Sequence, residues 1–144
     1  MDKIKYTKKE NSRFIQAIKE RNNNNEDKAI EILKELLHNR PNSTEFILTL
    51  GGIYFNMGNY RSSLRLFKRA TSLNPKSSLA SLGYYHSLWE LGYINAGLKE
   101  IDRFLEKSYL QDYLEIIKEL FEKKTYLIKY RNKIKKLYNK YIIT

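Results

Sequence analysis

The chain has 144 residues and a formal net charge of +11, with 27 lysines and arginines against 16 acidic residues. It contains no cysteine, which excludes disulfide bonds, thiolate metal sites and cysteine nucleophiles. An apolar fraction of 42% is sufficient for a folded core, and the length indicates a single domain, residues 1–144. The positive charge favours acidic partners, although AT-rich coding DNA alone would also enrich Lys, Asn, Ile and Tyr.

The amino-terminal segment, MDKIKYTKKE, is polar and charged and has no apolar core. It therefore does not have the pattern of a signal peptide. No uninterrupted apolar run in the chain approaches the ~18–20 residues that a membrane-spanning helix requires. We expect a cytoplasmic protein without a transmembrane segment.

Helical periodicity runs through the first half of the chain and is interrupted at two prolines. Pro41 and Pro75 each end a helix-like run, because proline cannot continue a helix. Apolar residues recur at intervals of three and four, which predicts helices rather than strands. They are Ala29, Ile30, Ile32, Leu33, Leu36 and Leu37 in one run, and Leu64, Leu66, Phe67, Ala70 and Leu73 in the other. The fold class is therefore all-α.

Pro41 and Pro75 are 34 residues apart. The same separation, which we call the repeat step, recurs elsewhere in the chain. Gly58 and Gly92 are separated by the same step, and glycine suits the left-handed position that follows a helix. The run from Asn22 to Asn25 is also more typical of a turn than of a helix interior. A step of about 34 residues predicts stacked two-helix repeats.

The carboxyl-terminal segment has no glycine or proline from Tyr109 to Thr144. Its apolar residues fall mostly at helical spacing, which fits two arrangements. It forms either one helix of about 30 residues, roughly 45 Å long, or a fourth hairpin broken near Lys124–Thr125. In either case we expect it to cap the exposed apolar side of the preceding repeat.

Residues 44–77 carry an ordered set of small, aromatic and turn residues at characteristic positions. The set comprises Leu50, Gly51, Tyr54, Gly58, Tyr60, Ser63, Phe67, Ala70 and Pro75. With these residues the chain resembles the tetratricopeptide repeat (TPR) family. The resemblance implies a right-handed superhelix of antiparallel helix hairpins, a TPR-like α-solenoid. Its repeats would span about 10–43, 44–77 and 78–111, followed by a capping and basic segment, 112–144.

The flanking repeats match the family pattern less well. In the first, Phe14, Ala17 and Ile18 fit only when slid by one position. In the third, Tyr85 stands where a small residue is usual, so we expect a wider helix crossing there. In the central repeat, Gly51 is small where the paired helices approach closely, and a bulky substitute would overpack that crossing.

The chain shows no pattern typical of an enzyme. Its two histidines, His38 and His86, do not lie at a metal-binding spacing. The acid pairs Asp112/Glu115 and Glu119/Glu122 fit a solvated helix face better than general acid–base catalysis. We therefore expect no enzymatic activity, no catalytic or metal-binding residue and no cofactor.

The resemblance implies instead a protein–protein interaction module. In the family, the first helices of successive hairpins line a concave groove that takes a peptide or a partner helix. The matching positions here form an apolar strip: Leu48, Gly52, Phe55, Asn56, Leu79, Leu82, His86, Trp89 and Glu90. We expect an adaptor that binds another protein, or a second copy of itself, in this groove. The alternative is that the chain's own amino-terminal arm or carboxyl-terminal helix fills it.

One specialisation of the family is not matched. Members that hold the acidic tail of heat-shock chaperones use set Lys, Asn and Arg positions in the groove. Leu79 and Gly83 occupy such positions in the third repeat, and the Lys-x-x-x-Asn pattern is missing between Asn11 and Asn22. We do not expect a chaperone-tail clamp.

A second hypothesis comes from the segment Lys123 to Thr144, which contains eight Lys or Arg and no acid. Interleaved tyrosines and lysines could bind phosphates and stack bases, so nucleic-acid or anionic-surface binding is the alternative function. A helix with tyrosines packed inward and lysines outward explains the same pattern. The basic patch comprises Lys129, Arg131, Lys133, Lys135, Lys136 and Lys140. A homo-oligomeric structural subunit is the third possibility.

Overall fold

The computed structural model describes residues 5–123 and 128–143, and this part of the chain is helical and contains no strand. No helix within it is long and apolar enough to cross a membrane. The α-helices are α1 (Lys8–Asn22), α2 (Glu26–Asn39), α3 (Thr44–Asn56), α4 (Tyr60–Leu73), α5 (Ser78–Glu90), α6 (Ile94–Leu105), α7 (Gln111–Glu122) and α8 (Arg131–Tyr141), with a short 3-10 helix, η1 (Ile128–Tyr130), before α8.

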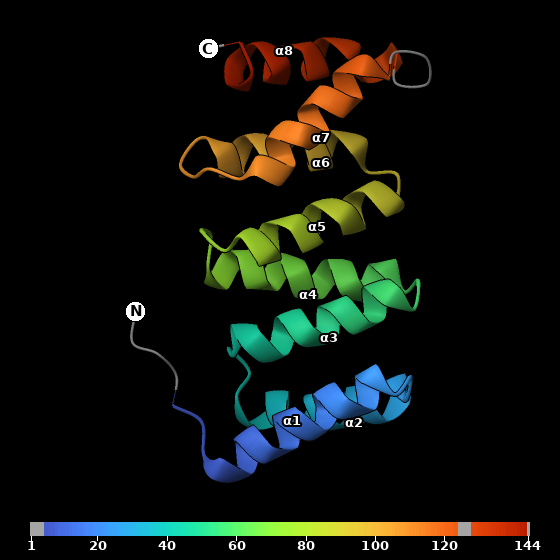
Figure 1. Ribbon diagram of the computed structural model, residues 1–144, viewed down its shortest axis with the longest axis vertical. Coiled ribbons are helices and arrows are strands. Elements are labelled where there is room, and N and C mark those ends of the chain that lie inside the picture. Colours follow the sequence, from blue (N-terminus) through green and yellow to red (C-terminus); the bar gives the residue numbers. More distant parts are fainter. Residues whose placement is uncertain (1–4, 124–127, 144) are drawn as a thin grey trace.

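The helices stack in chain order as hairpins. From α1 to α6, each helix packs against the next one along the chain. Figure 1 shows the hairpins piled along the long axis, from α1 and α2 at one end to α8 at the other. This arrangement is an α-solenoid, as the sequence predicts.

The turns inside the first three hairpins share one backbone conformation. Asn24, Gly58 and Gly92 have φ values of 62°, 79° and 80°, and successive members are one repeat step apart. After each of them, the next backbone N–H donates to a carbonyl five positions earlier, at 2.8 to 2.9 Å. This is the Schellman ending of a helix, which satisfies otherwise unpaired carbonyls. The asparagine run thus supplies the left-handed residue that glycine supplies in the other two turns.

The turns between hairpins are tied to the next hairpin by arginines. Arg69 donates to the carbonyl of Pro41 at 2.6 Å, and Arg103 donates to that of Pro75 at 3.1 Å. The two arginines are again one repeat step apart. The repeat therefore extends to a hydrogen bond that the helical pattern does not predict.

Small residues set the distance between helices around Phe67. A Cβ placed on Gly51 of α3 would lie 3.2 Å from the Phe67 ring, and one on Gly83 of α5 only 2.3 Å from it. Phe67 thus lies between two glycines. The bulky Tyr85 is accommodated because Gly97 faces its ring, where a Cβ on Gly97 would lie 3.4 Å from the ring atoms.

The first repeat requires a correction. Ala17 is fully buried and lies one repeat step before Gly51, so it needs no slide by one position. Helices α1 and α3 also end at equivalent positions, Asn22 and Asn56, but α1 has 15 residues and α3 has 13. The earlier start of α1 arises from a capping box, in which Thr7 and Glu10 bond each other's backbone N–H groups.

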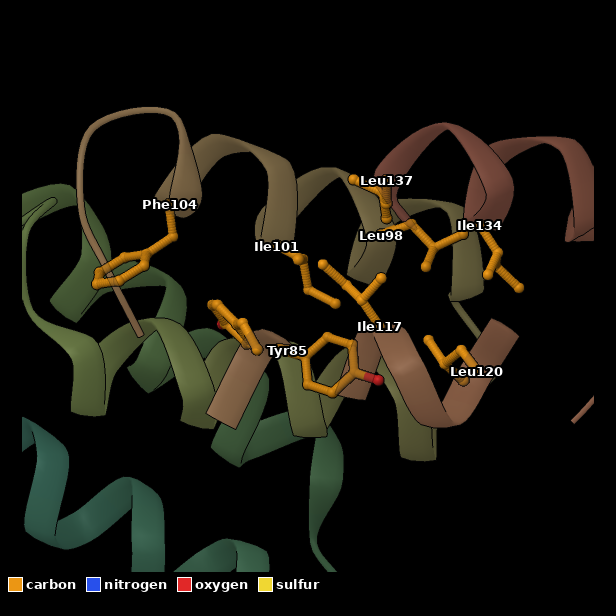
Figure 2. Close-up of a cluster of buried hydrophobic side chains, with 9 residues drawn as sticks. Tyr85, Leu98, Ile101, Phe104, Ile117, Leu120, Ile134 and Leu137 are labelled. Carbon is orange, nitrogen blue, oxygen red and sulfur yellow. The ribbon is translucent and has the colours of Figure 1, made fainter. Parts of the chain in front are cut away.

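The carboxyl-terminal segment forms two helices, α7 and α8, and not a single long one. The predicted break near Lys124–Thr125 lies outside the described residues. Helix α8 packs against α7 and α6. Figure 2 shows the shared core, in which side chains from α5 to α8 meet. Its buried members are Tyr85, Leu98, Ile101, Phe104, Tyr113, Ile117, Leu120, Ile134 and Leu137.

A buried polar network fixes α7 onto α5 and α6. The Glu100 carboxylate is only 4% exposed and accepts a 2.6 Å hydrogen bond from Ser81. The Ser81 hydroxyl has one proton, so in its 2.6 Å contact with Tyr113 the tyrosine is the donor. Arg103 donates twice to Glu100, each time at 2.6 Å. Burial raises the pKa of Tyr113 far above its usual range, so the phenol remains a donor.

Candidate functional site

The predicted groove residues lie on the surface formed by α3, α5 and α7, which we call the α3–α5–α7 face. Each of these helices directs one side toward the neighbouring helices of the stack. In α3 the inward residues include Phe46, Leu50 and Ile53, which are buried. The remaining side of the helix carries the predicted groove positions.

Helix α3 contributes an apolar but partly covered section. Leu48 packs beside the small cluster of Ile47, Ala70 and Ala80. Phe55 lies edge-on to Tyr60, with ring centroids 5.1 Å apart. Gly52 has open space where a side chain would begin, and Asn56 is exposed. The section therefore presents the half-buried Phe55 ring beside an open glycine.

Helix α5 contributes the most exposed apolar side chain on this face. Leu79 is 68% exposed, so no described part of the chain covers it. Leu82 and Trp89 are half-buried, because they also pack on the carboxyl-terminal core. The Trp89 ring lies 5.6 Å from Tyr85, centroid to centroid. Trp89 thus has a packing role in addition to its predicted place in the groove.

His86 lies where α3, α5 and α7 meet. Its ring is 6.4 Å from that of Phe55 and 5.1 Å from that of Tyr85, centroid to centroid. Desolvation lowers the pKa of His86, against the opposing effect of the negative charges of Glu90 and Asp112. The imidazole is therefore mainly neutral at pH 7. Among the described residues, no group of three His, Asp or Glu side chains could hold a metal ion.

Helix α7 extends this face, which the sequence alone did not predict. Phe46, Ala80 and Tyr113 are buried at equivalent places in α3, α5 and α7. Phe46 and Ala80 are separated by one full repeat step, whereas the separation of Ala80 and Tyr113 is one residue shorter than that step. Ser87 and Leu120 are buried with the same shortened spacing. In this register, the α7 residues equivalent to the groove positions Leu79, Leu82, His86 and Trp89 are Asp112, Glu115, Glu119 and Glu122. The shortened step becomes visible only through the burial of Tyr113 and Leu120, so the sequence offered no local signal for these residues.

The basic patch is partly used to attach α8. Lys140 bonds Asp102 at 2.8 Å and Glu106 at 3.0 Å, and Lys133 bonds Asn95 at 2.6 Å. Tyr141 also donates to Asp102, at 2.5 Å. Burial alone would raise the pKa of Asp102, but the bonds from Lys140 and Tyr141 lower it overall.

The other members of the patch lie mainly on the surface. Arg131, Lys135 and Lys136 are exposed, and the Lys129 ammonium lies 5.7 Å from the centre of the Tyr130 ring. A cleft of about 320 Å³ lies in the surface between the packed helices α6 and α8. Its lining comprises Asn95, Leu98, Lys99, Asp102, Lys133, Lys136, Leu137 and Lys140.

Comparison with known protein families identifies the repeats. Residues 23–83 match the model of the tetratricopeptide repeat family. The match covers less than half of the chain, so it identifies residues 23–83, within the stacked hairpins, as tetratricopeptide repeats. A comparison with curated protein sequences found no match.

Several solved structures share the fold. A MamA crystal structure superposes with a TM-score of 0.74 at 21% identity, over 91% of this chain and 70% of the MamA chain. The first TPR of Spaghetti (RPAP3), bound to the HSP90 peptide SRMEEVD, has a TM-score of 0.69 at 15% identity, over 79% and 91% of the two chains. MamA from Desulfovibrio magneticus RS-1, residue 41 to the end, gives 0.64 at 18% identity. That match covers 70% of this chain but 57% of the MamA chain, so this chain spans little more than half its length.

Proposed function

We propose that this chain is a non-enzymatic adaptor that binds a peptide or a helix of another protein on the α3–α5–α7 face. The observation that carries the proposal is the 68% exposure of Leu79 at the start of α5, on the face that also carries the half-buried rings of Phe55 and Trp89 near the ends of α3 and α5. Aromatic and aliphatic anchors of this kind are typical of binding hot spots. The Spaghetti (RPAP3) structure is an example of the same fold holding a peptide.

The described parts of the two terminal segments leave the α3–α5–α7 face uncovered. Helix α8 lies on α6 and α7, and Tyr6 in the amino-terminal arm bonds Ser43 at 2.6 Å, at the start of α3. Neither contact involves Leu79 or His86. The alternative in which the chain fills its own groove therefore has no support from the described residues.

The test is to select peptides on the immobilised protein from a phage-displayed library of random dodecapeptides. Selected peptides are then assayed against the variants Leu79→Ser and Phe55→Ala. We expect each variant to weaken binding at least about tenfold, since a buried apolar anchor contributes ~1.5–3 kcal/mol. The control is Ile143→Ser, an equally exposed apolar residue at the far end of the chain. Equal binding to wild type and both face variants would contradict the proposal.

Trp89 is less suitable for this test because it packs on Tyr85 and faces Gly97. Removing its indole would change the core as well as the surface. A loss of binding in Trp89→Ala would therefore not separate the two roles.

A second candidate function is binding of an anionic polymer or surface through the basic patch. The observation in its favour is the cleft between α6 and α8, whose rim carries Lys99, Lys133 and Lys136. Binding of single-stranded nucleic acid that falls steeply with salt and is lost in Lys135→Gln/Lys136→Gln would support it. The attachment of Lys133 and Lys140 to α6 accounts for much of the same charge through packing, so we rank this function second.

A further inference from the structure

Acidic and basic residues are concentrated on different helices of this chain. Helices α3, α5 and α7 together contain six acidic residues and one lysine. Helices α4 and α8 contain nine basic residues and no acid. The chain as a whole carries a net charge of +11, whereas the helices of the α3–α5–α7 face carry more acidic than basic residues.

The acidic residues continue the apolar row of the proposed binding face. Asp112, Glu115 and Glu119 occupy the positions that Leu79, Leu82 and His86 occupy one hairpin earlier. They are three or four residues apart, so they share one side of α7, and none of the three is buried. The ring of Tyr113, the chain neighbour of Asp112, lies 5.8 Å from the Tyr85 ring, centroid to centroid, so α7 runs beside α5 and its apolar row.

We propose that the partner segment is cationic: its apolar side chains pack on Leu79 and Phe55, and its lysines or arginines pair mainly with Asp112 and Glu115, because Glu119 already pairs with Lys123. This inference rests on the proposed function and names the chemistry of the partner. At physiological salt, charges farther apart than ~8 Å are largely screened, so the nearby carboxylates outweigh the distant net charge. An acidic segment such as SRMEEVD would instead place like charges against Asp112 and Glu115.

A second copy of the chain fits the face less well than a separate cationic segment. The basic helix α8 is already packed on α6 and α7, where Lys140 pairs with Asp102 and Glu106. Helix α4 is basic, but none of its large apolar side chains is strongly exposed. It therefore lacks an anchor to pair with Leu79.

The experiment measures the charge of the peptides selected from the random library. We expect Lys and Arg to be enriched, and Asp and Glu depleted, among peptides whose binding is lost in Leu79→Ser. A synthetic peptide from this set should bind about tenfold more weakly to Asp112→Asn/Glu115→Gln/Glu119→Gln, since each exposed pair contributes modestly. The matched control is Glu26→Gln/Asp27→Asn/Glu31→Gln, which neutralises three carboxylates on α2. It should bind like wild type.

The outcomes separate this inference from the proposed function. If selected peptides depend on Leu79 but are neutral or acidic, the cationic partner is wrong and the binding face stands. The same holds if the α7 triple variant binds as tightly as wild type. If no peptide is selected, or if binding is indifferent to Leu79, both proposals are wrong. Self-association detected by light scattering and abolished by Leu79→Ser would make a second copy the occupant instead.

Discussion

The junction between α4 and α5 and the junction that attaches α7 and α8 are built on different principles. At the first, the Phe67 ring lies between Gly51 and Gly83, and the buried hydroxyls of Ser63 and Ser87 share a 2.7 Å hydrogen bond. At the second, hydrogen bonds from Ser81 and Arg103 surround the buried Glu100 carboxylate. The comparison indicates that the internal junction is set mainly by the volume around Phe67, whereas the terminal junction adds to its apolar core a buried carboxylate that needs polar partners.

The largest expected effect concerns volume at the internal junction. Gly83→Ala would place a Cβ 2.3 Å from the Phe67 ring and 2.6 Å from its Cγ, so the ring cannot simply swing away. We expect the free energy of unfolding to fall by about 1–3 kcal/mol, even though alanine favours a helix. Urea denaturation measures the change.

The control for this prediction is Gly52→Ala, because a Cβ at Gly52 meets nothing within 4 Å. Alanine there should raise the free energy of unfolding by about 0.5–1 kcal/mol through helix propensity. If both variants changed stability in the same direction and by similar amounts, close packing around Phe67 would not govern the internal junction.

A smaller effect is expected at the polar junction. Tyr113→Phe keeps the ring in the core but removes the hydrogen bond to Ser81. We expect a loss of about 1 kcal/mol in the free energy of unfolding. Tyr109→Phe is the matched control, since Tyr109 is 72% exposed and should change stability by less than about 0.5 kcal/mol. Equal effects of the two substitutions would argue against the network as a determinant of α7 docking.

The smallest effect is a dependence on alkaline pH at the contact of α8 with α6. Burial, followed by the hydrogen bond to Asp102, raises the pKa of Tyr141 to about 12. A raised folded-state pKa means that stability is complete below the unfolded value of about 10 and decreases as the pH rises toward 12. In Tyr141→Phe this part of the alkaline decrease should be missing. The measurement is the difference in urea midpoint between the two proteins across this pH range.

Direct observation of the phenol provides the decisive check on Tyr141. With ¹³C-labelled tyrosine, the NMR resonance that is missing in Tyr141→Phe belongs to this side chain. It should titrate with a pKa of about 12. Titration at the ordinary tyrosine value of about 10 would contradict both the burial of this phenol and its hydrogen bond to Asp102.

Much of the fold can be predicted because its signals are local. Pro41, Pro75, Gly58 and Gly92 mark turns through backbone restrictions that operate wherever these residues stand. The apolar spacing of three and four between them indicates helices in the same way. The prediction of a turn at the asparagine run is also confirmed, with Asn24 in the left-handed conformation.

The candidate site can be predicted only in part. The groove positions on α3 and α5 can be predicted from the repeat match, and their role in binding remains a prediction. The sequence pattern of the acidic α7 residues indicates only a solvated helix face. Their register changes by one residue after α6, and the Gln111–Glu122 helix carries no turn glycine to reveal the shift. Only the burial of Tyr113 and Leu120 identifies it.

Local sequence was enough to define the helices, turns and repeat step of the first three hairpins, because each depends on neighbours along the chain. It left open whether the carboxyl-terminal segment is one helix or two. Which charges are paired and which stay exposed emerged only from the folded arrangement. Lys140 is bound to Asp102 across 38 residues of sequence, and Glu100 is buried by α5 and α7. The cost of burying or pairing a charge depends on what surrounds it in space, which no local pattern contains.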